Sequence, residues 1–180
     1  RAAAYAKEFE RFGIPLTAAR DGFYDSIEVA DLLNLLRLLD NPLQDLPLLA
    51  VLRSPIAALT SEELATIRLT IRKSHFWTAL QRWHELNSKS PDSNVAKLFQ
   101  KVQKFLTRFN RWRGLVKQIA LSQLLETILD ETYYCDWLVT QARGDQRCAN
   151  VARLLELTRQ FDSLQGQGLF RFVRDIESQQ

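Results

Sequence analysis

Apolar residues recur at helical spacing along most of the chain. Between residues 26 and 40 they cover well over half of a helix's circumference, which is typical of a central helix buried on nearly every side. Where the same spacing recurs between Gly, Pro and Asn, we expect further helices over the ranges 2–12, 44–52, 60–72, 76–86, 94–112, 115–129, 133–140, 146–161 and 169–178. Residues 16–19 alone suit a short strand. The pattern predicts an all-α fold.

These helices are expected to pack as a single compact multi-helix domain. Thr60 and Glu63 have the spacing of a capping box, in which the hydroxyl accepts from the Glu63 amide and the carboxylate reaches back. The expected core is made of large apolar side chains on the inner faces of the predicted helices. It includes Leu32, Leu35, Leu36, Leu39, Leu64, Phe105, Phe109, Leu124, Leu125, Leu154 and Phe172.

Composition narrows the class of protein. Apolar residues make up 46% of the 180 residues, and no apolar run approaches the roughly 18 residues that a membrane span needs. The sequence therefore predicts a cytosolic helical protein rather than a disordered or membrane-embedded one. Because the chain begins at Arg1 and contains no Met, we expect it to be a piece of a longer protein.

Basic residues gather on the longest predicted helix. Residues 93–125 hold seven of the 24 Lys and Arg residues and none of the 21 Asp and Glu residues. Five of these cations follow a 4-3-4-3 spacing, which places them within a sector of roughly 80° on one helix face, beside an apolar stripe. This set, the basic ridge, consists of Lys97, Lys101, Lys104, Arg108 and Arg111.

A row of uncompensated cations suits a polyphosphate backbone, because each cation can displace a condensed counterion. The basic ridge is therefore the candidate site for contact with the phosphates of duplex DNA. The alternative is a solvated helix face whose charges meet carboxylates from other elements, such as Glu8, Glu10 or Glu126.

Motifs for nucleotide binding or catalysis are missing from the sequence. It contains no Gly-x-x-x-x-Gly-Lys-Ser/Thr and no Gly-x-Gly-x-x-Gly. Cys135 and Cys148 lack the second close pair that a zinc site needs, and His75 and His84 are isolated, so we expect packing or surface roles for all four. The sequence predicts a non-catalytic piece without a metal site or a cofactor, which neither binds nor hydrolyses ATP.

The N-terminal third resembles the UvrD/Rep/PcrA/AddA helicases. Phe12-Gly-Ile-Pro15 is similar to an element that leaves the second RecA-like motor domain in that family. Gly22-Phe-Tyr-Asp-Ser-Ile-Glu-Val29 resembles the element that opens its inserted 2B subdomain, and the segment that ends in Asp40-Asn-Pro42 resembles the end of its first long helix. Arg53 and Ser54, in Val51-Leu-Arg-Ser-Pro55, continue the pattern and form a weaker candidate loop for DNA contact.

The C-terminal part is similar to the AddA-type (RexA-type) subunits of ATP-dependent helicase–nucleases. Glu131-Thr-Tyr-Tyr-Cys-Asp136 and Gln146-Arg-Cys-Ala-Asn150 carry this likeness. Leu169-Phe-Arg-Phe-Val-Arg-Asp-Ile-Glu177 resembles the helix that returns to the motor domain. Order and spacing together make the likeness specific, and residues 76–112 match least.

The resemblance implies a 2B-like accessory subdomain over residues 21–177, with residues 1–20 as a remnant of the second motor domain. It implies a bacterial, cytoplasmic parent that acts in DNA repair and recombination as an ATP-dependent helicase or exonuclease, with ATP and Mg²⁺ bound outside this chain. The expected partners are duplex DNA, a nuclease subunit, and the motor domains of the same chain. The alternative is a helical protein-interaction module that docks a partner protein.

Two departures from the family pattern bear on these expectations. Relatives of the UvrD type carry two glycines in a loop that approaches duplex phosphates, where this chain has Ile56-Ala57-Ala58-Leu59. Glycine permits close backbone approach, so the loop contact is in question and the basic ridge is favoured over it. Tyr133 also stands where the family has Gly, which is expected to change a helix start.

Overall fold

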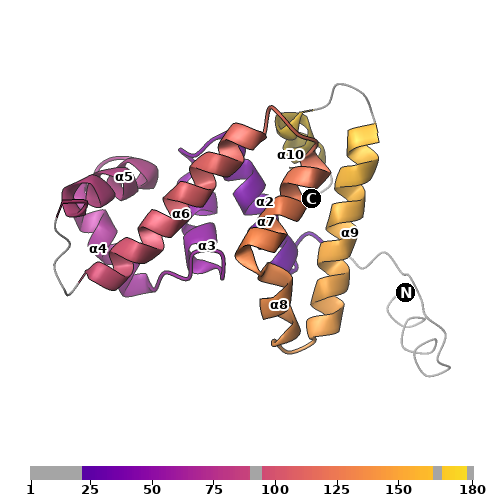
Figure 1. Ribbon diagram of the computed structural model, residues 1–180, viewed down its shortest axis with the longest axis horizontal. Helices are drawn as coiled ribbons and strands as arrows, with labels where there is room; N and C mark the ends of the chain where they lie inside the picture. The colour runs from indigo at the N-terminus through magenta and orange to yellow at the C-terminus, as the bar shows by residue number, and fades with distance from the viewer. Residues whose placement is uncertain (1–21, 90–94, 164–167, 178–180) are drawn as a thin grey trace.

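The computed structural model describes residues 22–89, 95–163 and 168–177, and in these ranges every regular element is an α-helix. The all-α prediction is confirmed. The predicted helix over 2–12 and the strand over 16–19 lie outside the described residues. The helices of Figure 1 are α2 (Ile27–Asp40), α3 (Asp45–Arg53), α4 (Ser61–Thr70), α5 (Phe76–Asn87), α6 (Ala96–Leu115), α7 (Leu121–Thr132), α8 (Tyr134–Val139), α9 (Gly144–Ser163) and α10 (Leu169–Glu177).

Helix α2 occupies the middle of the molecule and is covered on most of its circumference. Val29, Leu36 and Leu38 have no exposed surface, and Leu32, Leu33, Leu35 and Leu39 are also buried. Helices α3, α6, α9 and α10 all pack against α2. In Figure 1, α4 and α5 form one end of the molecule and α9 the other, with α2 between them. The apolar pattern of residues 26–40 predicted this position, and all eleven residues of the predicted core are buried.

The capping box at the start of α4 is confirmed. The Glu63 amide donates to Thr60 Oγ1 over 3.2 Å, and the Thr60 amide donates to Glu63 Oε2 over 2.7 Å. Both interactions satisfy amides that the first turn of a helix leaves without an intrahelical partner.

The boundary between α6 and α7 was predicted wrongly. Helix α6 continues past Trp112 to Leu115, and the Val116 amide still donates to the Trp112 carbonyl over 3.1 Å. Helix α7 begins only at Leu121, because Asp162 of α9 accepts from the amides of Leu121 (3.0 Å) and Ser122 (2.8 Å). A carboxylate far away in the sequence therefore contributes to the start of α7, together with Gln123, whose side-chain oxygen accepts from the Ala120 amide over 3.4 Å.

Helix α5 also begins at a remote carboxylate. Asp45, in the first turn of α3, accepts from the amide of Phe76 over 2.8 Å. A negative charge at a helix N-terminus is favourable because it meets unpaired amides and the positive end of the helix dipole. This contact fixes α5 to α3 and so places the face of α5 that meets α6.

Tyr133 separates α7 from α8 in a left-handed backbone conformation, with φ 55° and ψ 35°. Left-handed backbone is unfavourable for a residue with a β-carbon and is normally taken by Gly. Tyr133, which stands where the family pattern has Gly, is the residue at which α7 ends and α8 begins. The Tyr133 side chain is 68% exposed, so its burial does little to offset the backbone cost.

A partly buried polar cluster joins α2 to α8 and α9. The Tyr134 hydroxyl donates to Asp31 Oδ2 over 2.9 Å, and the Asn150 amide donates to Glu28 Oε1 over 2.6 Å. Burial raises the pKa of Asp31 to about 6, and the nearby Glu28 carboxylate adds to this effect, while the Tyr134 hydrogen bond opposes it. The ionised Asp31 carboxylate is thus held in an environment that favours its protonated form.

We expect Tyr133→Gly to raise the free energy of unfolding by about 0.5–1 kcal/mol, because it removes the left-handed strain and little packing. Urea titration of both proteins is the measurement. Tyr133→Ala is the control, since it removes the same ring but keeps a β-carbon, and it should not stabilise. A gain of equal size in both variants would assign the effect to the ring instead.

Stability should depend on the charge of Asp31. The folded chain holds this proton more tightly than the unfolded chain, whose aspartates have a pKa near 3.8. The ionised form therefore costs stability above pH 6, and the cost disappears as the pH falls from about 6 towards 4. Asp31→Asn keeps an acceptor for Tyr134 and should stabilise the protein by about 1 kcal/mol at pH 8, after allowance for the partial exposure of the carboxylate. Unfolding measured at pH 8 and pH 4 should show that gain only at pH 8; equal stability of the two proteins at pH 8 would contradict the assignment.

Candidate nucleic-acid interface

The basic ridge lies along α6, beside the face that this helix buries. That inner face consists of Leu98, Val102, Phe105, Leu106, Phe109 and Trp112. It packs on α5, where the rings of Trp77 and Phe109 lie 4.9 Å apart, and on α2 and α7. The ridge covers a sector of roughly 80° around the helix axis. Some of its members therefore lie nearer than others to the buried face of α6. The structure therefore divides the predicted set into an inner and an outer part.

Lys101 belongs to the inner part. Its ammonium lies 2.9 Å and 3.0 Å from the two carboxylate oxygens of Glu63 and 3.0 Å from the Ala58 carbonyl. Burial alone would raise the pKa of Glu63, but the bonds from Lys101 and from the Thr60 amide outweigh it and lower the pKa below its usual 4.5. Lys101 thus holds α6 to the start of α4 rather than facing solvent freely.

Glu131, at the end of α7, binds the C-terminal half of the ridge. Arg108 donates to the Glu131 backbone carbonyl, and Arg111 pairs with Glu131 Oε1 over 2.7 Å. The other carboxylate oxygen, Oε2, accepts from the indole nitrogen of the fully buried Trp112 over 2.9 Å. Arg108 is half-buried by this contact, whereas the Arg111 side chain keeps 64% of its surface exposed.

Lys97, Lys104 and Arg111 form the outer row of the ridge. They recur every seventh residue, which on a helix puts them in line and about 10.5 Å apart. Lys97 and Lys104 are exposed, and neither has a hydrogen-bond or ion-pair partner within the ranges that the structure describes. The outer row is therefore where positive charge reaches solvent.

The predicted alternative, a ridge neutralised by carboxylates from elsewhere, holds for part of the set. Glu63 and Glu131 pair with Lys101 and Arg111, although the sequence had suggested other carboxylates. Glu126 instead lies 2.6 Å from Arg159, and Glu8 and Glu10 fall outside the described residues. Among the described residues, an ion pair with a carboxylate is thus found at Lys101 and Arg111, whereas Arg108 bonds to a carbonyl.

The loop after α3, the weaker candidate, is closed against the body of the domain. Ser54 is 7% exposed, and its hydroxyl donates to the Val51 carbonyl over 2.8 Å. Arg53 is exposed and donates to the hydroxyl of Ser61. Ala58 has a left-handed φ of 53°, and its carbonyl accepts from Lys101. Of this pair, only Arg53 offers a side chain at the surface.

The four residues set aside as packing or surface residues have those roles. Cys135 and Cys148 are half-buried free thiols packed against the core, with the Cys148 sulfur 3.9 Å from the Cys135 carbonyl. His84 stacks on Phe99 with ring centroids 5.1 Å apart, and His75 is exposed at the start of α5. The described ranges contain no group of three His, Cys, Asp or Glu side chains placed to hold a metal ion. None of the helices described there is both long and apolar enough to cross a bilayer.

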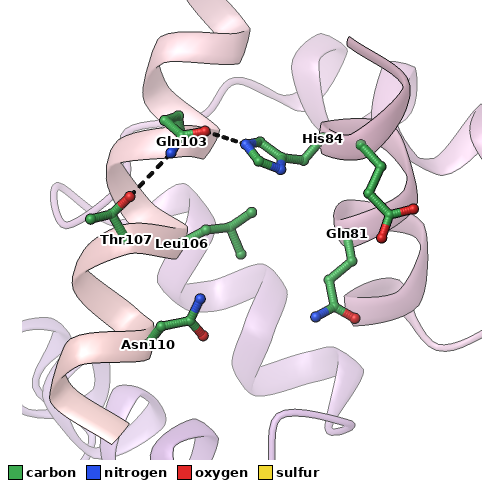
Figure 2. A pocket seen from close by; sticks show the side chains of 7 residues that line it. Gln81, His84, Gln103, Leu106, Thr107 and Asn110 are labelled. Carbon is green, nitrogen blue, oxygen red and sulfur yellow. Dashed lines mark hydrogen bonds between the residues drawn. The ribbon is translucent and has the colours of Figure 1, made fainter. Parts of the chain in front are cut away.

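A polar pocket between α5 and α6 was not foreseen from the sequence (Figure 2). Its volume is about 200 Å³. Three of its polar side chains, Gln103, Thr107 and Asn110, recur at helical spacing next to the outer row. That spacing was the available signal, but the helix that forms the opposite wall cannot be assigned from local sequence.

The inner and outer parts of the ridge should differ in their contribution to the free energy of unfolding. Lys101→Ala removes three polar contacts and should lower the free energy of unfolding by about 1 kcal/mol. Lys104→Ala, the matched control on the same helix, should change it by less than about 0.5 kcal/mol. Urea unfolding measures both; equal effects of the two substitutions would rule out the division into inner and outer parts.

The chain is similar over nearly its whole length to known bacterial proteins, which are AddA-type subunits of an ATP-dependent helicase/nuclease. It is 37% identical over 172 residues to the one from Lysinibacillus sphaericus, in an alignment that covers 95% of this chain and 14% of that protein. The protein from Heliobacterium modesticaldum is 37% identical over 181 residues, covering 98% and 13%. The one from Geobacillus thermodenitrificans is 36% identical over 172 residues, covering 95% and 14%.

No family model matches the chain. The chain spans about one seventh of the length of the curated relatives that it matches. Identity at this level over almost the whole chain means that the chain is homologous to a segment of the AddA-type ATP-dependent helicase/nuclease proteins.

Proposed function

We propose that this chain is a 2B-like accessory subdomain of an ATP-dependent DNA helicase/nuclease and that it engages the phosphate backbone of duplex DNA. Homology to a short segment of proteins named as ATP-dependent helicase/nuclease subunits supports the parent activity. The motif resemblance at both ends of the chain supports the position within the parent. ATP and Mg²⁺ then bind to motor domains elsewhere in the parent, and the chain does no chemistry of its own.

The observation that carries the DNA contact is the outer row of the ridge. Lys97 and Lys104 are exposed without a partner in the described part of the chain, and Arg111 presents a guanidinium with a single carboxylate beside it. Their spacing of about 10.5 Å along the helix covers roughly three nucleotides of one DNA strand. Contacts of this kind bind phosphate irrespective of base sequence.

The inner part supports the row indirectly. Lys101 and Arg108 fasten α6 to α4 and α7, so the helix presents the outer cations from a fixed position. A rigid row loses little conformational freedom when it meets the duplex, which favours binding. In this proposal Lys101 and Arg108 position the helix, and Lys97, Lys104 and Arg111 contact phosphates.

The second candidate function is a protein-interaction module that docks a nuclease partner protein or the motor domains. Tyr133, Trp137 and Val139 are exposed apolar residues around α8, and such side chains are enriched in protein interfaces. Salt separates the two functions. Phosphate contacts weaken steeply as salt rises, whereas apolar docking changes little.

We expect the double variant Lys97→Ala/Lys104→Ala to bind a blunt DNA duplex more weakly than the wild-type chain. Its plot of log affinity against log salt should be flatter by about two units, one for each phosphate contact removed. The measurement is fluorescence anisotropy with a labelled duplex at several salt concentrations.

Arg72→Ala/Lys73→Ala is the matched control, because it removes the same charge from exposed residues that lie between α4 and α5 and outside the ridge. It should leave the salt slope unchanged. An unchanged slope in the α6 variant would make the outer row a solvated face and would favour the protein-interaction module.

A further inference from the structure

The polar pocket between α5 and α6 has one pre-assembled wall. It is lined by Gln81, His84, Glu85, Gln103, Leu106, Thr107 and Asn110. The His84 ring bonds to the Gln103 carboxamide, whose nitrogen donates to Thr107 Oγ1 over 3.3 Å (Figure 2). On its other face His84 stacks almost parallel to Phe99, at an interplanar angle of 3°. These contacts hold the wall in place and engage both the oxygen and the nitrogen of the Gln103 carboxamide.

The opposite end of the pocket offers hydrogen-bonding groups that no contact uses. Figure 2 shows Gln81 of α5 and Asn110 of α6 at the same end of the pocket, with Leu106 between them and the locked wall. Both carboxamides are exposed, and neither has a hydrogen-bond partner among the residues that the structure describes. Each offers two donors and one acceptor. The buried Leu106 gives the space between them an apolar floor.

Two free carboxamides over an apolar floor suit a flat ring with donors and acceptors on its edge. Carboxamides pair with the edges of nucleobases through two hydrogen bonds, as Asn and Gln do with adenine. A cavity of about 200 Å³ is smaller than the roughly 300–1,000 Å³ of sites for drug-sized ligands. The pocket therefore suits one small planar group, of the size of a single nucleobase. Glu85 is the acidic residue among those that line the pocket, and its carboxylate forms an ion pair with Arg82 over 3.2 Å.

The nearby outer row of cations indicates which kind of molecule would place such a planar group in the pocket. Thr107 lines the pocket, and on α6 it lies between Lys104 and Arg111, one turn from each. We propose that the pocket takes an unpaired nucleobase from a DNA strand whose phosphates lie on the outer row. The base must be unpaired, because stacking and pairing in a duplex keep its edges out of a protein pocket. This inference rests on the proposed DNA contact, to which it adds a site for single-stranded DNA beside the duplex.

The test compares three DNA ligands of equal length: a mixed-sequence single strand, a blunt duplex, and a single strand with abasic sites in place of its central bases. The variant is Gln81→Leu/Asn110→Leu, which removes both free carboxamides from exposed positions. It should bind the single strand about tenfold more weakly than the wild-type chain and the duplex with unchanged affinity. The wild-type chain should bind the abasic strand about as weakly as the variant does, and the variant should show no further loss there.

Gln100→Leu is the matched control, since Gln100 is an exposed residue of α6 beside the outer row but outside the pocket. It should bind all three ligands as the wild-type chain does. The proposal is overturned if the pocket variant binds the single strand normally, if it loses the same affinity for the abasic strand, or if Gln100→Leu matches it. A wild-type chain that binds no single strand overturns it as well.

The outcome separates this inference from the DNA contact on which it rests. If Lys97→Ala/Lys104→Ala flattens the salt slope while the pocket variant binds normally, the phosphate row stands and the base site is wrong. If the pocket variant alone loses affinity for the single strand, the pocket binds a base but the phosphates lie elsewhere, which overturns the phosphate row and the placement of the strand on it.

Discussion

Burial of α2 on most of its circumference is the constraint on which the rest of the fold depends. A helix with this many buried Leu and Val side chains must be covered on several sides, and each fully buried side chain contributes about 1.5–3 kcal/mol. Helices α3, α6, α9 and α10 supply the cover. Helix α6 also packs on α5 through Phe109 and Trp77, so its apolar face is buried. Its basic residues therefore lie either at the edge of this buried face or on the solvent side of the helix.

The same constraint divides the cations by role. Arg111 belongs to the outer row and stays largely exposed, although it also pairs with Glu131. The inner cations meet groups from neighbouring helices: Lys101 meets the Glu63 carboxylate, and Arg108 meets the Glu131 carbonyl. These contacts join α4 and α7 to α6 and fix its position. Lys97 and Lys104, further from the buried face, are left as exposed charge. A single amphipathic helix thus holds the domain together along its rim and presents exposed cations along its outside, next to a pocket lined by its adjoining polar face.

Helix positions and the core could be predicted because their signals are local. The spacing of apolar residues on α2, the Thr60–Glu63 capping box and the stripe of α6 all lie within one element. Contacts between distant residues could not be predicted. The Asp162 cap of α7, the Asp45 cap of α5 and the carboxylates that meet the ridge depend on how the helices pack. The polar pocket could not be predicted for the same reason, because its lining residues come from two helices.

Lysine footprinting in the presence of duplex DNA tests the central claim, that the outer row of α6 carries the DNA contact, most directly. The acylation rate of each Lys is measured with and without the duplex. We expect strong protection of Lys97 and Lys104, little change at Lys73 and Lys117, and a low rate in both conditions at Lys101, whose ammonium already bonds to Glu63 and Ala58. Equal protection of all exposed lysines, or protection of Lys73 without Lys97 and Lys104, would contradict the account.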